Sequence, residues 1–308
     1  MKKIYHKNHR AIIKKHIRLI NKVNDGESLT LSGYDDFFKF IATGNVENIT
    51  KNQEALNEEF SLCYLYAASV RLLSFTFSAQ KPEHNLIPSD WLGEDARPNP
   101  NLVFETLLSQ ISDYSYSVIK LAESGLDNPA RSLVRVLSEL VQQTLCLAAN
   151  VNDVREYVAA HEDHEATKVW YQLFGKGKLD KKLTTIESAL GLTEDLIFSL
   201  REERTNTHKF YSQNIHHSFT ASVVGSRSWA FSDESCRDSF FGGHSSSLRA
   251  PLSALTRSLW YFNIMFLAIF NNLHGFKVPD IKDSFWFPYF AIRDASNEIF
   301  LEGLKPSS

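Results

Sequence analysis

The chain contains few residues that interrupt helices: glycine occurs 13 times and proline 9 times in 308 residues. Together they make up about 7% of the sequence, where roughly 12% is typical of proteins. This shortage excludes a collagen-like or low-complexity chain and disfavours β-sandwiches and barrels, which need many turns. Apolar residues (43%) and charged residues (22%) occur at ordinary globular frequencies, which excludes overall intrinsic disorder. The composition therefore favours a folded protein with long helices.

Cysteines and long apolar runs are also scarce. The three cysteines are widely spaced, form no CxxC pair and give no disulfide pattern, so we expect a reducing compartment. The first ten residues, MKKIYHKNHR, lack the apolar core of a signal peptide. The longest apolar run, Leu259–Phe270, is shorter than the roughly 20 residues of a membrane span. We expect this run to be a buried core helix, with no membrane span and a cytoplasmic location.

The common catalytic motifs are missing too. The sequence holds no GxGxxG, GxxxxGK[ST], HExxH or GxSxG. It therefore disfavours the common nucleotide-binding, zinc-protease and α/β-hydrolase classes. No cofactor and no metal site are expected.

Apolar periodicity predicts helices along most of the chain. We expect an all-α bundle of seven to nine helices, with a small irregular or hairpin insertion near residues 217–245. The loop at 81–101, which holds four prolines, suggests a boundary between an N-terminal arm and helical region (1–100) and a helical-bundle core (101–308). The predicted helices cover residues 9–24, 52–80, 102–123, 127–150, 154–174, 182–190, 193–217 and 245–273. The segment 30–51 is ambiguous, with at most one short helix around 35–42, and residues 285–299 form a last, aromatic-rich segment.

Positive charge is concentrated at the N-terminus. Residues 1–24 carry eight lysines and arginines and no acid, which leaves −11 for the remaining residues because the whole chain carries −3. Residues 9–24 are predicted to form a short basic amphipathic helix. A basic arm on an acidic body indicates an interaction partner but does not specify its kind.

Two histidines near residue 161 are candidate metal ligands. His161 and His164 stand one helical turn apart, and Glu162 and Glu165 flank them. Histidines at this spacing can share one metal ion, but no second cluster supplies a third ligand. A solvated helix face is the favoured interpretation.

Two predicted helices carry polar side chains beside their apolar faces. In the helix 127–150, one polar stripe is formed by Arg131, Arg135, Glu139 and Gln142. An ion pair between Arg135 and Glu139 would make this stripe structural, whereas a ligand-facing network would make it functional. Both interpretations stay open on the sequence alone.

In the helix 193–217, basic and hydroxyl groups share the apolar face, where unpartnered charges would be costly. These groups are Arg201, Arg204, His208, Tyr211 and Ser212, and His216 follows at the helix end. Because each stripe needs a partner, we predict that the two helices pack together. Arg131, Arg135 or Glu139 should then lie near Arg204, His208 or Ser212.

Two segments resemble a bacterial family of all-helical proteins that carry a domain of unknown function. PARSLVRVLSEL (129–140) resembles its Ala-Arg-x-Leu-x-Arg-x-Leu-x-Glu helix, and FYSQNIHHS (210–218) resembles its second signature at a helix end. More loosely, Arg201 and His208, with six residues between them, resemble the Arg–His signature of HEPN domains. Glu202 departs from the polar residue, often asparagine, that usually follows that arginine.

The HEPN resemblance implies a helical RNA-binding protein or a metal-independent endoribonuclease of a toxin–antitoxin or phage-defence system. Arg201 and His208 would be catalytic, the chain would form a homodimer, and an antitoxin or defence protein would be a further partner. The basic arm 1–24 would then hold the RNA backbone by charge. The residues expected to bind are Arg131, Arg135, Glu139, Arg204, Tyr211, Ser212 and His216.

Two other interpretations remain. The chain could be a non-enzymatic interaction module or sensor whose polar face binds a protein or a small anionic ligand. The basic arm could also be a membrane-surface anchor, which ranks last because its only aromatic residue is Tyr5.

Overall fold

The structure, a computed structural model, describes residues 7–23, 30–77, 84–93, 98–160, 162–216, 218–219, 242–243, 246–280 and 282–304. These residues contain eleven α-helices and no strand, so the expectation of an all-α fold is confirmed and the helix number is higher than expected. Most of the predicted insertion at 217–245 lies outside the described residues. The helices are α1 (Lys7–Val23), α2 (Leu31–Ala55), α3 (Asn57–Thr76), α4 (Pro100–Glu123), α5 (Asp127–Ala149), α6 (Val151–Ala159), α7 (Asp163–Leu173), α8 (Lys178–Ala189), α9 (Glu194–Ile215), α11 (Arg249–His274) and α12 (Phe287–Gly303), with a 3-10 turn η3 (Ser246–Leu248).

The additional helices come from breaks that periodicity does not reveal. Leu56 leaves the helical conformation (φ −126°, ψ 36°) and separates α2 from α3. The segment predicted as one helix at 154–174 is two helices, because Glu162 begins α7 with a capping box shared with Glu165. The short helix expected around 35–42 is part of the 25-residue α2.

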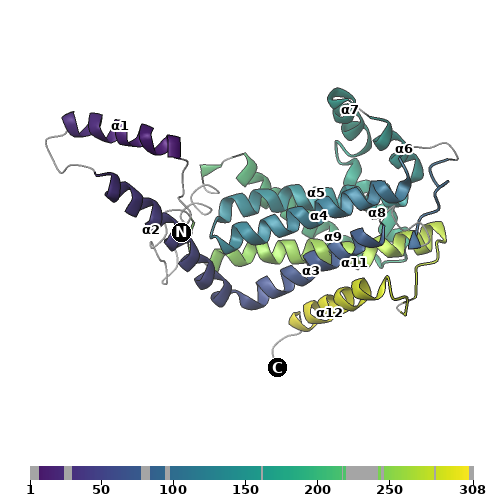
Figure 1. Cartoon of the computed structure of the whole chain (residues 1–308). Coiled ribbons are helices and arrows are strands. Elements are labelled where there is room, and N and C mark those ends of the chain that lie inside the picture. Colours follow the sequence, from purple (N-terminus) through teal and green to yellow (C-terminus); the bar gives the residue numbers. More distant parts are fainter. Residues whose placement is uncertain are drawn as a thin grey trace.

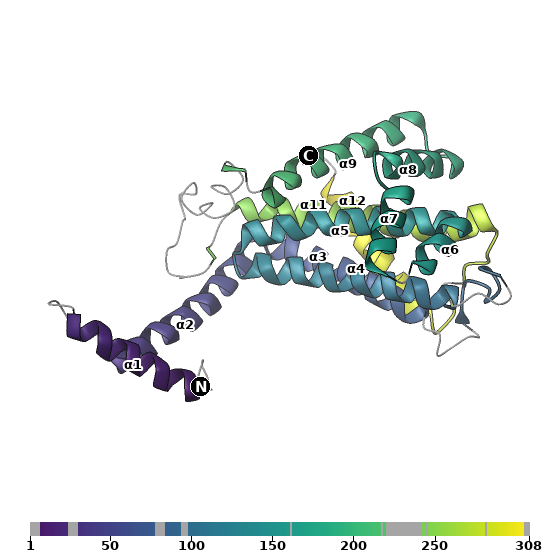
Figure 2. The same cartoon turned by 90° about the horizontal axis from the view of Figure 1, so that it is seen from above.

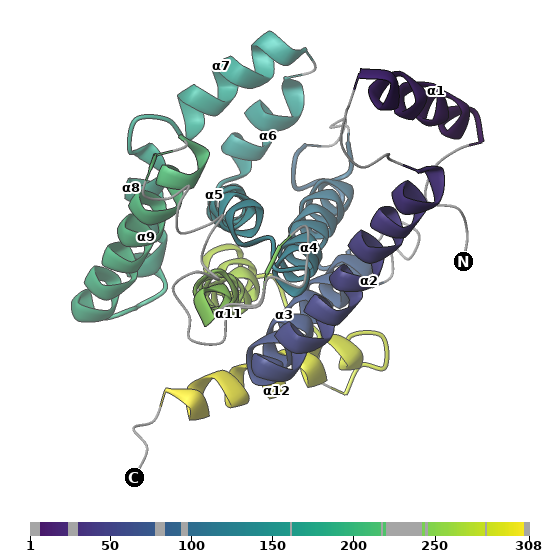
Figure 3. The same cartoon turned by 90° about the vertical axis from the view of Figure 1, so that its left-hand side faces the viewer.

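Four long helices form the bundle (Figure 1). α3 packs on α4, α4 on α5, α5 on α11, and α11 on α3, so the four enclose one core, which the end-on view shows (Figure 3). Phe77, Phe104, Phe266 and Phe270 meet in the core, with ring centroids 5.2–6.3 Å apart. Burying several phenylalanines of this size stabilises the fold by about 1.5–3 kcal/mol each. The domain boundary at residue 100 stays a prediction, although α3 packs in the same bundle as α4.

The remaining helices cover this bundle. α12 packs on α3, while α8 and α9 pack on α5 and on each other. α6 follows α5 directly, and α7 lies against α6. In Figure 3, α8 and α9 form an outer layer beside α5. The two predicted helices with polar stripes are therefore neighbours.

α1 and the N-terminal part of α2 project away from one end of the bundle (Figure 2). The C-terminal part of α2 is held at the turn between α4 and α5. Asn48 Nδ2 donates to Ser124 O at 3.1 Å, and Asn52 Nδ2 donates to Glu123 O at 3.0 Å. The turn itself needs glycine, because Gly125 has φ +71° and a Cβ there would lie 2.2 Å from Gly243 O.

α11 contains the apolar run that was predicted to be a core helix. Its Leu259, Phe262 and Phe266 are fully buried. Among the described residues it is the one helix long and apolar enough to cross a membrane, and 67% of its most apolar window is buried inside the bundle. The core helices of soluble proteins pass the same test.

Candidate functional site

The predicted contact between α5 and α9 is present. Arg135 Nε donates to Ser212 Oγ at 3.3 Å, and Arg135 Nη2 donates to Glu139 Oε1 at 2.5 Å. Ser212 Oγ in turn lies 3.3 Å from His208 Nδ1. Glu139, Arg135, Ser212 and His208 therefore form one polar chain, which we call the α5–α9 chain. Both predicted stripes contribute to it: two residues come from each helix.

Within the α5–α9 chain, His208 is the titratable side chain whose pKa is shifted. Partial burial lowers the pKa of His208 below its ordinary 6.5, and the positive charge of Arg135 lowers it further, while Glu139 opposes the shift. Both effects favour the neutral imidazole over the charged one. With Nδ1 beside Ser212, Nε2 is the nitrogen left to meet a ligand.

Arg131 has a structural role in this arrangement. Its side chain is 3% exposed, and its Nε donates to Asp127 Oδ1 at 2.7 Å. Its Nη2 donates to Ser247 O at 3.0 Å, and its guanidinium lies 5.4 Å from the Phe210 ring centroid. These contacts join α5, α9 and η3 and leave little of this side chain for a ligand.

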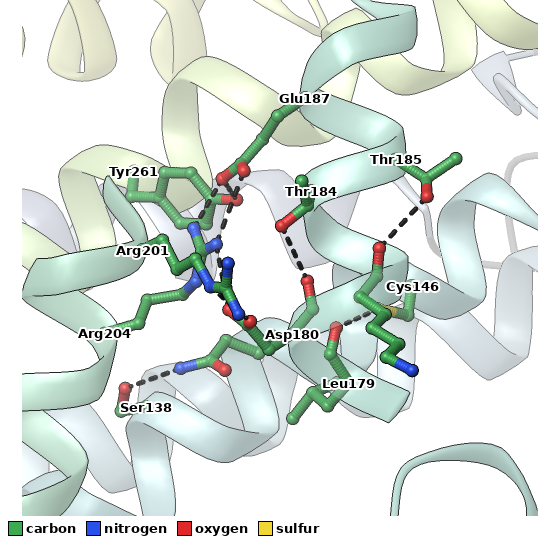
Figure 4. A network of polar contacts seen from close by, with 12 residues as sticks. Ser138, Cys146, Leu179, Asp180, Thr184, Thr185, Glu187, Arg201, Arg204 and Tyr261 are labelled. Atoms are coloured by element: carbon green, nitrogen blue, oxygen red, sulfur yellow. Dashed lines mark hydrogen bonds and ion pairs between the residues drawn. The ribbon is translucent and has the colours of Figure 1, made fainter. Parts of the chain in front are cut away.

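Arg204 belongs to a second polar cluster, which joins α8, α9 and α11 (Figure 4). Its Nη1 donates to the fully buried Glu187 at 2.5 Å, and its Nη2 donates to Asp180 at 3.3 Å. Tyr261 also donates to Glu187, at 2.6 Å, and burial raises the pKa of this tyrosine well above 10. Arg204 Nε is buried with no hydrogen-bond partner among the described residues.

Arg201 also contacts this second cluster. Its Nε lies 2.8 Å from Asp180 Oδ2, and its side chain is 60% exposed. Arg201 therefore pairs with α8, whereas His208 contacts Ser212, which in turn contacts Arg135 of α5. The structure brings Arg135, rather than Arg201, into the polar chain of His208.

The other predicted binding residues lie near the end of α9. Tyr211 is buried and donates to Ala250 O at 2.9 Å, and burial raises its pKa to about 12. His216 is exposed and ends α9, where its backbone N–H donates to Ser212 O at 3.0 Å. Tyr211 thus ties α9 to α11, and His216 has a capping role.

A cleft of about 350 Å³ opens beside the α5–α9 chain. Its walls come from α5, α9 and the turn between α7 and α8, which includes Lys176 and Gly177. Its charged lining residues are Arg135, Glu139, Lys176, Asp180, Arg204 and Lys209, together with His208. Four basic groups face two acids, so the cleft carries a net positive charge. We call this space the α5–α9 cleft.

A larger, mainly apolar cleft of about 700 Å³ adjoins the α5–α9 cleft. It lies among α4, α5, α6 and α7, and Tyr114, Leu140 and Val169 are in its lining. Glu139, Trp170 and Phe174 line both clefts. The polar chain therefore stands at the border between a charged space and an apolar one.

The sequence analysis missed Glu187, Asp180 and Tyr261. Glu187 had a signal: it follows the buried Leu183 and Ile186 on the same helix face, and an acid on an apolar face needs a cation. Tyr261 lies inside the apolar run of α11, so the sequence does not distinguish it from the aromatic residues that only pack in the core. Lys176 has φ +55°, a backbone conformation that sequence spacing does not predict for lysine.

Metal ligands do not gather among the described residues: no group of three or more His, Cys, Asp or Glu could hold an ion there. His164 Nδ1 lies 3.3 Å from Glu162 Oε2 at the exposed start of α7. His161 lies outside the described residues, so the distance between the two candidate ligands His161 and His164 is not given by the structure.

Comparison of the chain with protein-family models, with curated proteins and with solved structures finds no match.

Proposed function

We propose that the chain binds a small, phosphate-bearing anion in the α5–α9 cleft and works as a non-enzymatic ligand-binding module. The observation that carries this proposal is the lining of the cleft, where four basic groups and His208 face two acids. A volume of about 350 Å³ lies within the range of small-molecule sites, roughly 300–1,000 Å³.

The basic groups divide into two kinds. Arg135 and Arg204 are held in place by Glu139 and Glu187, so they present fixed positive charge at the base of the cleft. Lys176 and Lys209 are exposed at its rim and form no ion pair with the described residues. The rim lysines supply charge that is not already neutralised, so they should contribute most of the anion affinity.

Tripolyphosphate titrated calorimetrically into the full chain tests this proposal. We expect saturable binding, weakened roughly tenfold or more by the pair Lys176→Glu and Lys209→Glu, because each reversal replaces a charge-assisted contact with repulsion. Lys168→Glu with Lys181→Glu is the matched control: both lysines are exposed and lie outside the cleft lining. Equal binding by the two double variants would refute the site.

A second candidate function is metal-independent RNA cleavage, favoured by the contact of His208 with Ser212 and Arg135. A neutral His208 could take the proton of a ribose 2′-OH, whose oxygen then attacks the adjacent phosphorus. The 5′-oxygen would leave with a proton supplied by water, giving a 2′,3′-cyclic phosphate and a 5′-hydroxyl. Arg135 would stabilise the negative charge on the phosphoryl oxygens. The HEPN resemblance supports the same chemistry, with Arg201 in that role.

A labelled RNA pool, incubated with and without EDTA, separates the two candidates. The binding module predicts no RNA turnover by the wild type. A ribonuclease predicts turnover that EDTA does not affect and that His208→Ala abolishes. If RNA is cleaved, comparison of Arg135→Ala with Arg201→Ala shows which arginine acts on the phosphate. The two arginines are distinguishable because Arg201 pairs with Asp180 at the surface, whereas Arg135 belongs to the polar chain of His208.

A further inference from the structure

The helical register of α1 places its basic positions on one side and its isoleucine, leucine and valine positions on the other, with the small Ala11 among the basic positions. At 100° per residue, its six basic positions fall within one arc of about 140°, and its six aliphatic positions fall within the opposite arc of about 160°. No acid occurs in the helix. By register, His9 and His16 also fall within the apolar arc. The basic positions are Lys7, Arg10, Lys14, Lys15, Arg18 and Lys22, and the aliphatic positions are Ile12, Ile13, Ile17, Leu19, Ile20 and Val23.

The fold covers only part of this apolar arc. Ile17 is 6% exposed, on the side of α1 where Ile13 is also partly covered. The other aliphatic side chains are open to solvent: Ile12 is 56% exposed, Leu19 47%, Ile20 46% and Val23 84%. A cluster of large exposed aliphatic residues with a charged border marks an interaction surface.

The position of α1 makes this surface accessible. α1 packs against α2, which spans about 37 Å for its 25 residues. The Asn48 and Asn52 contacts fix the other end of α2 to the bundle. Two views at right angles show α1 standing clear of the four-helix bundle (Figures 1 and 2). A broad, flat partner could therefore reach α1 without meeting the bundle core.

The chemistry of the surface decides between partners. RNA offers phosphates for the basic arc but no apolar phase for Ile12, Leu19, Ile20 and Val23. A second copy of α1 could cover the aliphatic residues, but it would bring another six positive charges close to the first six. An anionic bilayer surface satisfies both arcs, because lipid headgroups meet the lysines and arginines while the acyl boundary takes the aliphatic side chains.

We propose that α1 binds the surface of an anionic phospholipid bilayer, lying in the interface plane with its aliphatic face toward the acyl chains. α2 would then hold the bundle, including the α5–α9 cleft, at a distance from the membrane. This role is independent of what the cleft binds. It also replaces RNA as the partner of the basic helix, since exposed aliphatic residues take over the anchoring that aromatic residues often provide.

Co-sedimentation of the full chain with vesicles tests the proposal. We expect binding to vesicles of phosphatidylcholine and phosphatidylserine in a 7:3 ratio, little binding to phosphatidylcholine alone, and weaker binding as salt rises. The aliphatic variant Ile12→Gln, Leu19→Gln, Ile20→Gln should bind the mixed vesicles roughly tenfold or more weakly. The basic variant Lys14→Gln, Lys15→Gln, Arg18→Gln should lose a similar factor.

Matched controls come from exposed residues elsewhere in the fold. Ile299→Gln with Leu301→Gln, on α12, controls for the loss of exposed aliphatic surface (47% and 49% exposed). Lys168→Gln with Lys181→Gln controls for the loss of charge. Both controls should bind vesicles as the wild type does, and glutamine keeps helix propensity high in all variants.

Three results would overturn the membrane proposal. One is no binding to the mixed vesicles. Another is loss of vesicle binding in the basic variant alone, because simple charge attraction, as in RNA binding, would then suffice. The third is a change of oligomeric state in the aliphatic variant, measured by light scattering, with vesicle binding intact, because a second copy would then cover the face.

Discussion

Glu187 provides the sharpest test of what holds the candidate site together. It is fully buried in α8, and it accepts hydrogen bonds from Arg204 on α9 and from Tyr261 on α11. Glu187→Ala leaves Arg204 with Asp180 as its remaining acid, at 3.3 Å, inside a largely buried cluster. Removing one partner of a buried ion pair costs about 3–5 kcal/mol, because the other charge stays desolvated.

Glu187→Gln should cost less, about 2–3 kcal/mol, because the amide oxygen still accepts one hydrogen bond while the charge is lost. For a chain of 308 residues, each kcal/mol lowers the melting temperature by roughly 1–2 °C. Urea unfolding followed by circular dichroism gives the free energies directly, provided that the denaturant dependence stays the same in all variants.

Arg201→Ala is the matched control for this cluster. Its side chain is 60% exposed and pairs with the same Asp180, so its loss should cost less than about 1 kcal/mol. If Glu187→Ala destabilises the protein no more than Arg201→Ala does, Glu187 does not anchor α8 and α9 to the bundle. The positions of the cleft-lining residues would then need another explanation.

Three further predictions concern the bundle. Gly125→Ala should destabilise the fold by at least about 1–3 kcal/mol, measured by urea unfolding, because φ is +71° and the Cβ would meet Gly243. For Glu123, burial alone would raise the pKa, but hydrogen bonds from Lys120, Tyr64 and Gln53 outweigh it and lower the pKa below 4.5. Its stabilisation is therefore complete above pH 4.5 and is lost as the pH falls through the lowered value, so Glu123→Gln should flatten the acid limb of a stability–pH curve. Burial raises the pKa of Cys63 and Cys146 to about 12, so peptide mass spectrometry should find both unmodified after iodoacetamide treatment of the native protein at pH 7.5, and modification of either would contradict their burial.

The helical class could be predicted because it follows from composition and period. Scarce glycine and proline, together with apolar spacing, are properties of the sequence itself, and the bounds of α4 and α5 agree closely with the prediction. The breaks at Leu56 and Glu162 could not be read in the same way. Leu56 is an ordinary helix former whose backbone conformation is fixed by packing, and the capping box at Glu162 uses a glutamate in the position that usually holds serine or threonine.

The contact between the two polar stripes was predictable from one rule, that buried polar groups need partners. The rule predicted that one of Arg131, Arg135 and Glu139 lies near one of Arg204, His208 and Ser212. Arg135 does contact Ser212, which lies beside His208. The rule could not assign individual partners, because Arg204 pairs with Glu187 and Asp180 from α8, a helix that the sequence did not connect with α9. Spacing along one helix describes which residues share a face but says nothing about which other helix that face meets.

The pKa of His208, followed by NMR of its imidazole, tests anion binding in the α5–α9 cleft most directly. In the free protein, the pKa should lie below 6.5, because burial and then Arg135 disfavour the charged ring. Saturating tripolyphosphate should raise this pKa, since a bound anion favours the imidazolium, and its affinity should increase as the pH falls. The shift should disappear in the Lys176→Glu, Lys209→Glu variant and persist in the Lys168→Glu, Lys181→Glu control. A His208 pKa that tripolyphosphate leaves unchanged would contradict the central claim.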